Sequence, residues 1–278
     1  MCALDAMKFP PIHFEASSFT ARRKLLRLAG FGTASLLLPS FVRAQVWRQS
    51  PAIIDSVGDI PVSEGGLELT LPLVAEDGSS VPLTVNSDAL KGGDRIKKLE
   101  IFAPGNPTPQ VAVFEFGPEI DKVNLATRIR LSESQTVVAV AHTDQGNIHV
   151  AERAVRVTTS GCIAPAQSDP SNEMNARVRI PRNWKAGTPA EVLTMISHPM
   201  TTGLAQDASG NTPSMRIIDQ FEASLDGRPL VSARFFRSLA ANPYLKFDVT
   251  PTREGELQFQ WTEDTGRAVE HTEAVRLT

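Results

Sequence analysis

The sequence has few of the residues on which many protein functions depend. Only two of its 278 residues are cysteines, three are tryptophans and one is a tyrosine. Hydrophobic residues make up 41% and charged residues 21% of the chain, a balance that excludes a disordered chain and a membrane-embedded one. The scarcity of aromatics predicts a mostly aliphatic interior, and the length favours two modest domains with two small cores.

The sequence motifs of several enzyme classes are also missing. The chain has no G-x-S-x-G nucleophile elbow, no phosphate-binding loop and no dinucleotide fingerprint. No histidine is placed by the sequence to serve a cysteine as a general base. These absences predict a protein that is not an enzyme and that binds no cofactor.

The first 44 residues have the composition of an export signal. A twin arginine, Arg22-Arg23, precedes the apolar stretch Leu25–Leu38, and the small-residue ending at Ala44 suits a signal peptidase. About 14 apolar residues are too few to span a bilayer core of about 30 Å. We therefore expect residues 1–44 to be a cleaved twin-arginine (Tat-type) signal and the mature chain to lie in the periplasm.

Cleavage of this segment changes both the charge and the thiol content. It removes six basic and two acidic residues, which leaves 22 basic against 29 acidic and a net charge of −7. Without a basic cluster, binding to nucleic acid or to an anionic membrane surface has no electrostatic driving force. Cleavage also removes Cys2 and leaves Cys162 as an unpaired thiol, which is unusual in an oxidising compartment.

The remaining sequence is typical of β-strands. Apolar residues alternate with polar ones in Leu67–Leu73, Val81–Val85 and Leu257–Trp261, as they do in strands with one buried face. The continuous apolar run Thr136–Ala141 predicts a central strand buried on both faces. Residues 163–175 are polar, interrupted by proline and without periodicity, so we expect a linker between two β-sandwiches.

Cys162 lies where the first half meets this linker. Small residues such as Ser160 and Gly161 precede it, and we expect an exposed, mobile thiol. Such a thiol can attack sulfur as a thiolate or be oxidised through sulfenic acid if its pKa supports the anion. Arg153 and Arg156 are the candidates to favour the thiolate.

Other interpretations of these residues stay open. Cys162 could be an inert small residue at a strand end. Met195, His198, Met200 and Met215 could form a soft-metal (copper) site with it, although no Cys–His pair has metal-ligand spacing. The chain could also act only as a docking module for a dehydrogenase. His198 precedes a proline, and we expect it to fix a loop by hydrogen bonds rather than to act as an acid or base.

Several segments resemble two known families in order. Those that resemble SoxY-type sulfur carriers are Leu71–Pro82, Asn106–Pro109 and Phe114. Those that resemble SoxZ-type partner domains are Ile196–Gly203, Ala241–Leu245 and Trp261–Gly266. Together they cover residues 50–278, and the chain resembles a SoxYZ fusion like the single-chain carriers associated with quinoprotein dehydrogenases.

This resemblance implies an all-β fold of two immunoglobulin-like sandwiches in tandem, a SoxY-like carrier domain at 50–162 and a SoxZ-like domain at 176–278. It implies that Cys162 is the carrier cysteine, on an arm that includes Ser160 and Gly161. Sulfur intermediates would be held there covalently as a thiosulfonate or persulfide. Periplasmic sulfur-oxidising enzymes, or a quinoprotein dehydrogenase system, would load, oxidise and release them.

The carrier segment departs from the family pattern. Family arms end the chain as Gly-Gly-Cys-Gly-Gly, whereas here Gly161-Cys162 is followed by Ile163 and the chain continues into the next domain. Pro165 stiffens the following limb. A cysteine tethered on both sides has to approach a partner as a loop, so the cargo and the partner enzymes are open questions at this point.

Overall fold

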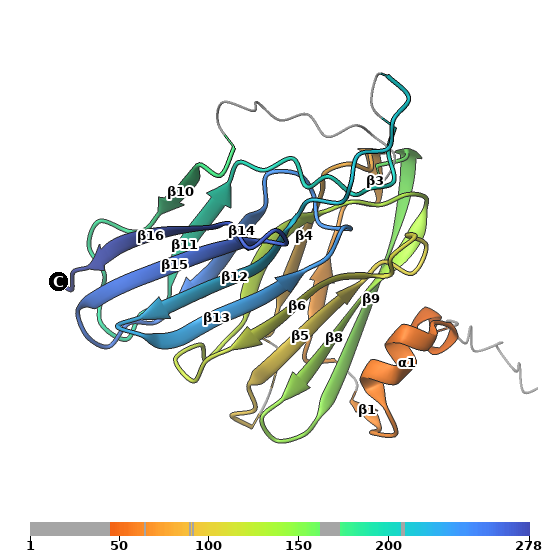
Figure 1. Ribbon diagram of the computed structural model, residues 1–278. Helices are drawn as coiled ribbons and strands as arrows, with labels where there is room; N and C mark the ends of the chain where they lie inside the picture. Colours follow the sequence, from red (N-terminus) through yellow and green to blue (C-terminus); the bar gives the residue numbers. More distant parts are fainter. Residues whose placement is uncertain (1–44, 64, 89, 91, 162–172, 207–208) are drawn as a thin grey trace, which may run out of the picture. The chain divides into compact units, whose positions relative to one another are not determined.

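The computed structural model describes residues 45–63, 65–88, 90, 92–161, 173–206 and 209–278 (Figure 1). The expected export signal therefore lies outside the described residues. Ala44–Thr278 forms one compact unit. It is built mostly from β-strands in two sheets, with one short α-helix, which confirms the predicted fold class.

Among its described residues, the N-terminal half, 45–161, holds the helical elements and nine strands. Its elements are η1 (Val46–Gln49), α1 (Pro51–Val57), β1 (Val62–Ser63), β2 (Glu68–Thr70), β3 (Val74–Asp77), β4 (Val81–Asn86), β5 (Ile96–Phe102), β6 (Gln110–Phe116), β7 (Asn124–Ile129), β8 (Gln135–Thr143) and β9 (Ile148–Thr159).

The C-terminal half, residues 173–278, holds seven strands in the described residues. They are β10 (Ala176–Arg179), β11 (Ala190–Ile196), β12 (Ile218–Leu225), β13 (Arg228–Phe235), β14 (Tyr244–Val249), β15 (Gly255–Glu263) and β16 (Ala268–Val275). Their alternation follows the sequence, because Leu257, Phe259 and Trp261 of β15 are all buried.

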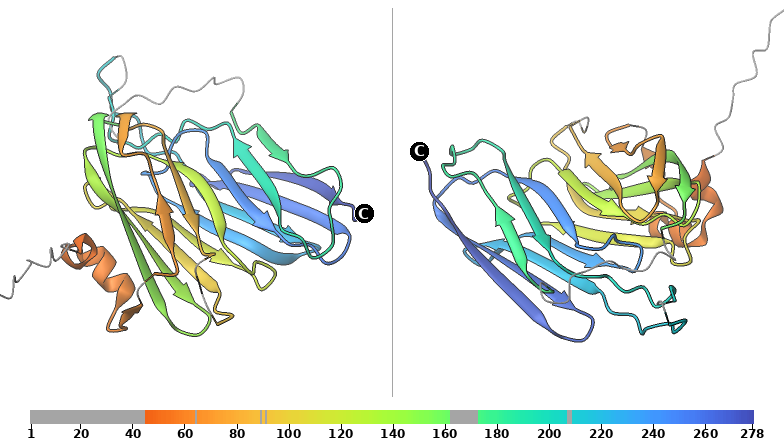
Figure 2. Two further views of the ribbon diagram at one scale, coloured as in Figure 1. Left: turned by 180° about the vertical axis from the view of Figure 1, so that it is seen from behind. Right: turned by 90° about the horizontal axis from the view of Figure 1, so that it is seen from above.

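Both sheets run through both halves (Figures 1 and 2). The larger sheet has the order β1-β9-β8-β5-β6-β13-β12-β15-β16, with β3 added beside β9. The smaller has the order β10-β11-β14-β7-β4-β2. The halves join where β6 pairs antiparallel with β13 and β7 with β14. No strand edge is left open at the junction, since main-chain hydrogen bonds cross it in both sheets.

The interior is continuous across this junction. One cluster of buried side chains extends from Leu69 in β2 to Val275 in β16. The expectation of two separate small cores is therefore wrong. The alternation of apolar and polar residues along a strand predicts which face of the strand is buried. It does not show whether the sheet ends at that strand or continues into the other half.

Helix α1 accounts for the apolar run in β8. Val137, Ala139 and Ala141 face the main core, whereas Val138 and Val140 face a second cluster formed with Trp47, Ile53 and Val57. The strand is thus buried on both faces, as the run Thr136–Ala141 predicted. The helix itself was missed, because seven residues are too few to establish a helical period.

One predicted strand is shorter than expected. Only Glu68–Thr70 of the alternating segment Leu67–Leu73 forms a strand, and Leu73 is 69% exposed. After β2 the chain leaves the six-stranded sheet and joins the other sheet as β3. In the part of the chain that the structure describes, no helix is long and apolar enough to cross a membrane.

Candidate functional site

The end of β9 is built into the sandwich up to Gly161. β3 pairs parallel with β9, and Asp77 lies opposite Thr159. Two residues later, the backbone N–H of Gly161 donates to the carbonyl oxygen of Leu131 at 2.9 Å, and Gly161 is buried. Main-chain hydrogen bonds therefore hold the chain as far as Gly161, the last described residue before Cys162.

A contact between two glycines explains the residue type at this position. A Cβ atom on Gly161 would lie 2.0 Å from both the carbonyl carbon and oxygen of Gly78, and one on Gly78 would lie 2.3 Å from the oxygen of Leu131. Gly78 also accepts from the N–H of Leu131 at 2.8 Å and donates to the oxygen of Thr159 at 2.9 Å. Gly161 thus permits a close backbone approach, and its role as part of a free arm is not supported.

The other predicted arm residue, Ser160, is half-buried between Thr159 and Gly161. Cys162 itself lies outside the described residues, as does the rest of the expected linker up to residue 172. The prediction that Cys162 is the functional thiol therefore stays a prediction, and the described site is the pair of segments on either side of it.

The two arginines predicted to support a thiolate are not gathered at Gly161. Arg153 and Arg156 are exposed, three positions apart on β9, and so point to opposite faces of the strand. At about 3.3 Å per residue their Cα atoms lie about 26 Å and 16 Å before that of Gly161. Asp77 lies nearer to Gly161 than either arginine does, because it pairs with Thr159. The hydroxyl and N–H groups of Ser79 hold the pKa of the Asp77 carboxyl below the usual range.

The far side of the linker is anchored through Glu173. The Nη2 atom of Arg216 donates to both carboxylate oxygens of Glu173, each at 2.9 Å. The next residue, Met174, donates its N–H to the oxygen of Ser197 at 2.7 Å, and Ser197 donates to the oxygen of Asn175 at 3.0 Å. The chain is thus fixed by a charged pair and by main-chain bonds as soon as it enters the described C-terminal half.

His198 is fully buried and fixes the adjacent loop, as predicted. Its Nδ1 accepts from the N–H of Met200 at 3.0 Å, so its Nε2 carries the proton donated to Glu263 at 2.8 Å. Its backbone exchanges hydrogen bonds with Asn242, at 3.0 Å and 2.8 Å. Burial lowers the pKa of His198 and outweighs the opposing effect of Glu263, so His198 is neutral.

Glu263 connects this loop to Arg216. Burial raises the pKa of its carboxyl, but hydrogen bonds from Thr265 and His198 and the charge of Arg216 outweigh burial and bring the pKa below its usual range. The Nε atom of Arg216 lies 3.7 Å from Glu263. Arg216 therefore lies between two carboxylates, one in the core and one at the end of the linker.

Arg130 links the two sides of the site. It precedes Leu131, and its side chain, from a residue only 2% exposed, donates to the carbonyl oxygens of Leu239, Pro199 and Met200 at 3.2, 3.2 and 3.1 Å. The segment that accepts from Gly161 is thereby connected to the loop that holds Met174. This role could not be predicted from the sequence, because Arg130 directly follows an ordinary strand pattern.

Several of the segments that carried the family resemblance contribute to the network around Arg130. Asn106 donates to the carbonyl oxygen of Arg130 at 2.7 Å and to the hydroxyl of Ser238 at 3.1 Å. His198 is hydrogen-bonded both to Asn242 and to Glu263, so these two segments lie next to the His198 loop. These residues therefore contribute hydrogen bonds at the junction between the halves.

Two of the residues considered for a soft-metal site, His198 and Met200, already make hydrogen bonds within the chain. Both ring nitrogens of His198 are hydrogen-bonded, and the sulfur of Met200 accepts from the N–H of Ile218 at 3.2 Å. Met195 lies half-buried on β11 and Met215 is 41% exposed. Among the described residues no group of three or more His, Cys, Asp and Glu side chains is placed to hold a metal.

A second cluster contains a serine, a histidine and a glutamate but lacks the geometry of a catalytic triad. Ser56 of α1 bonds to Glu100, and His142 Nε2 lies 3.2 Å from Glu100 and 3.4 Å from Ser56. One ring nitrogen thus faces both partners, whereas a triad uses two. Despite burial, bonds from His142, Ser56 and Lys98 lower the pKa of Glu100 to about 2. The cluster fastens α1 to the sheet.

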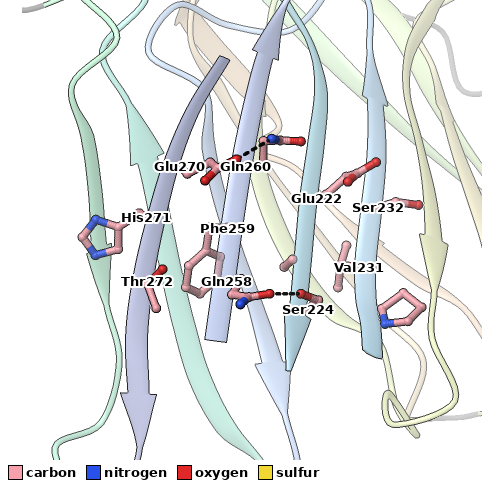
Figure 3. A pocket seen from close by; sticks show the side chains of 12 residues that line it. Glu222, Ser224, Val231, Ser232, Gln258, Phe259, Gln260, Glu270, His271 and Thr272 are labelled. Atoms are coloured by element: carbon pink, nitrogen blue, oxygen red, sulfur yellow. Dashed lines mark hydrogen bonds between the residues drawn. The ribbon is translucent and has the colours of Figure 1, made fainter. Parts of the chain in front are cut away.

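A polar groove of about 540 Å³ crosses the outer face of β12, β13, β15 and β16 (Figure 3). Its side chains include Glu222, Gln258, Gln260 and Glu270, and Gln260 donates to Glu270 at 3.0 Å. The lining contains carboxylates, amides, hydroxyls, the imidazole of His271 and apolar side chains such as Phe259, but neither a thiol nor a lysine or arginine. It therefore offers no nucleophile comparable to a cysteine.

Comparisons with known proteins identify both halves. The family model for sulfur oxidation protein SoxY matches residues 54–162, and that for sulphur oxidation protein SoxZ matches residues 178–274. No curated protein sequence matches the chain. Among solved structures, the sulfur carrier protein SoxY from Chlorobium limicola f thiosulfatophilum is 30% identical, over 38% of this chain and 93% of that one, with a TM-score of 0.33.

A superoxide reductase (neelaredoxin) from Ignicoccus hospitalis is 17% identical, over 39% of this chain and 83% of that one, with a TM-score of 0.30. The two family models together match most of the chain, at residues 54–162 and 178–274, in the order SoxY then SoxZ. The chain therefore belongs to the SoxY and SoxZ families of sulfur-oxidation carrier proteins, as a fusion with the SoxY domain first.

Proposed function

We propose that this protein is a periplasmic carrier that holds sulfur intermediates covalently on Cys162. The observation that carries the proposal is the position of this residue, because the SoxY match ends at residue 162, directly after the anchored Gly161. The thiol thus stands at the end of the carrier half, and after signal cleavage it is the chain's one remaining thiol.

The loading chemistry requires a redox partner. Joining the Cys162 thiolate to thiosulfate forms one S–S bond and releases two electrons, so that R–S⁻ and S₂O₃²⁻ give R–S–S–SO₃⁻. The electrons pass to a partner oxidoreductase, since a carrier with one thiol has no acceptor of its own. Later release of sulfate by hydrolysis leaves a persulfide on the same sulfur, ready for another partner.

The partners are periplasmic sulfur-oxidising enzymes, and the alternative is a quinoprotein dehydrogenase system. The mature net charge of −7 gives no electrostatic support for nucleic acid or membrane partners. In this arrangement residues 1–44 are a cleaved Tat-type signal, 50–162 form the carrier domain, 163–175 form the linker and 176–278 form the partner domain. The protein acts with enzymes and is not one.

Intact mass spectrometry tests the proposal directly. The mature chain is isolated from periplasm without reductant, and measured before and after reduction beside the Cys162→Ser variant. We expect an adduct with the mass of a thiosulfonate or persulfide that reductant removes and the variant lacks. A bare thiol that stays unmodified after exposure to thiosulfate and periplasmic extract would contradict the carrier function and favour a docking role.

A further inference from the structure

We propose that the outer face of the smaller sheet, centred on Met195 and Tyr244, is a docking surface for a partner protein whose own surface is acidic. The partner is one of the enzymes that act with the carrier, so the inference rests on the proposed function. Five neighbouring strands, β10, β11, β14, β7 and β4, form the surface. Its residues, which we call the basic face, are Arg177, Met195, Tyr244, Arg128 and Pro82 in one row, and Arg179, Leu193, Lys246, Ala126 and Thr84 in the next.

The side chains of the basic face point away from the core. In β11, β14, β7 and β4, buried residues alternate with half-buried or exposed ones, and the basic face consists of the latter. In β10, Arg177 and Arg179 are the exposed residues. Helix α1 packs against β8 of the larger sheet instead (Figure 1). Within the described part of the chain, therefore, no helix covers the basic face.

Apolar and aromatic side chains occupy the middle of the basic face. Leu193, Met195 and Tyr244 are half-buried. The guanidinium of Arg128 lies 5.1 Å from the centroid of the Tyr244 ring, as in a cation–π contact. Tyr244 is the chain's one tyrosine, whereas all three tryptophans are buried. Because tyrosine, methionine and arginine are enriched where proteins bind one another, the composition of the basic face is that of a contact surface.

Positive charge dominates the basic face. It carries no carboxylate and four cationic side chains, which are Arg128, Arg177, Arg179 and Lys246. Glu191, in the adjacent row, lies 3.0 Å from Lys246 and 3.6 Å from Arg179. One carboxylate thus serves two of the cations, and an excess of positive charge is left on the surface.

The other two cations are open to a partner. Arg128 and Arg177 form no ion pair with any residue that the structure describes. Asp248, the second carboxylate of the adjacent row, accepts instead from the side-chain amide of Asn124 at 3.0 Å. Because a guanidinium group can bind a carboxylate through two parallel hydrogen bonds, each of these arginines can pair with an acidic side chain of a docked protein.

The outer face of the larger sheet has the opposite charge in the same half. The groove there is lined by Glu222 and Glu270 and by neither lysine nor arginine. The SoxZ half is therefore acidic on one outer face and basic on the other. Such a separation of charge turns the basic face toward an acidic protein and speeds the encounter. A second copy is a poor occupant, because two chains with a mature net charge of −7 repel each other.

The position of the basic face suits a partner that acts on the carrier half. Pro82 follows Gly78 by four residues, and Gly78 contacts Gly161, the last described residue of that half before the linker. Four residues span at most about 14 Å. A protein seated on the row that contains Pro82 and Arg128 is thus beside the described end of the carrier half, and it contacts both halves at once.

Site-specific photo-crosslinking tests the proposal on the mature full chain. The photoreactive residue p-benzoylphenylalanine replaces Met195 in one protein and Gln260 in a matched control. Both positions are half-buried on outer faces of the SoxZ half. Each protein is irradiated in periplasmic extract of the native host from which the natural carrier has been removed, and mass spectrometry identifies the crosslinked protein and peptide. We expect a product from Met195 only, with aspartate or glutamate in the crosslinked peptide of the partner.

Charge reversals on the basic face assign the contact. Arg177→Glu and Arg128→Glu should each lower the yield of the Met195 product about fivefold, and so should about 0.5 M salt, which screens exposed charges. Arg267→Glu, at an exposed residue between β15 and β16, changes the net charge equally and should leave the yield unchanged. Lysine in place of the mapped carboxylate of the partner should restore the yield with Arg177→Glu. Thermal midpoints confirm that each variant is folded.

Several results would overturn the proposal: no product from Met195, equal products from Met195 and Gln260, a product that joins two copies of this chain, or a yield that Arg177→Glu changes no more than Arg267→Glu does. The adduct measurement on Cys162 is independent of all of them. An adduct without a Met195 product leaves the carrier function standing without this docking surface. A charge-dependent Met195 product without an adduct supports the docking surface and contradicts the carrier function.

Discussion

Apart from β1 and β3, which only the N-terminal half has among the described residues, the two halves of the chain have the same strand order but different outer surfaces. In the larger sheet, β9-β8-β5-β6 meets β13-β12-β15-β16, and in the smaller one β2-β4-β7 meets β14-β11-β10. Each half therefore repeats the other, reversed about the junction. The matching order explains how two immunoglobulin-like units can join through main-chain pairing in both sheets, since the same edges face each other.

The outer face shows where the halves differ. In the SoxY half, α1 covers β5, β8 and β9 with apolar side chains and with the Ser56–Glu100 bond (Figure 1). In the SoxZ half, the equivalent face carries the polar groove lined by Glu222 and Glu270 (Figure 3). A shared core thus leaves each half free to carry a different outer surface.

The buried charges differ in the same way. Glu100 of the SoxY half lies under α1, on the outside of the sandwich, where it fastens a helix. Glu263 of the SoxZ half lies near the junction, where it orients His198 and Arg216. Glu100 therefore attaches a cover to the sheet, while Glu263 fixes the loop of His198 and the side chain of Arg216.

The largest expected effect comes from breaking the junction between the halves. Arg130→Met should lower the free energy of unfolding by about 3–5 kcal/mol, because three buried carbonyl oxygens lose a charged donor. Chemical denaturation measures the change. Arg128→Met, two residues earlier and exposed, removes only a contact with the ring of Tyr244, 5.1 Å from its centroid, and should cost about 1 kcal/mol or less. Equal losses would contradict the role given to Arg130.

A smaller effect should separate α1 from the rest of the SoxY half. Ile53 is fully buried against the sheet and Ile54, its neighbour, is 43% exposed. Ile53→Ala should cost about 2–4 kcal/mol, and Ile54→Ala about 0.5 kcal/mol or less. Hydrogen exchange should show faster opening of α1 and β8 in the first variant. Equal acceleration across β12–β16 would mean that the helix supports the whole unit.

The sequence predicted the strands well and their partners poorly. The run Thr136–Ala141 was correctly predicted to be buried on both faces, because a strand with apolar residues at successive positions has an apolar side chain on each face. Leu73 was expected to be buried because it continues an alternation, but the chain changes sheets after Leu71. Local pattern carries no information on where a chain crosses between sheets.

The candidate site was predicted only in part for a related reason. His198 was correctly predicted to fix a loop, since a histidine before Pro199 suggests a turn. Gly161 was interpreted as a flexible residue, whereas its requirement for glycine comes from Gly78, which is distant in sequence. Arg130 gave no signal at all, because its partners are carbonyl groups of loops in the other half. Contacts between distant segments decide what such residues do.

The smallest predicted effect is a pH dependence located in the SoxZ half. The folded-state pKa of His198 lies below its usual value because of burial, so the unfolded chain binds a proton that the folded chain excludes. Its contribution to stability is then complete above about pH 6.5, the unfolded value, and is lost as the pH falls toward the folded pKa. One such group changes the free energy of unfolding by no more than about 1.4 kcal/mol per pH unit.

Denaturation at pH 7.5 and 5.5 tests this assignment. His198→Gln should lower stability at pH 7.5 but reduce the difference between the two pH values, because the variant has no proton to exclude. His271→Gln, at a partly exposed histidine on β16 of the same half, is the matched control for losing a histidine. A difference that persists in His198→Gln would place the pH dependence elsewhere. His198 would then not be the group that the folded chain keeps unprotonated at pH 5.5, although its Nδ1 accepts from Met200 and its Nε2 donates to Glu263.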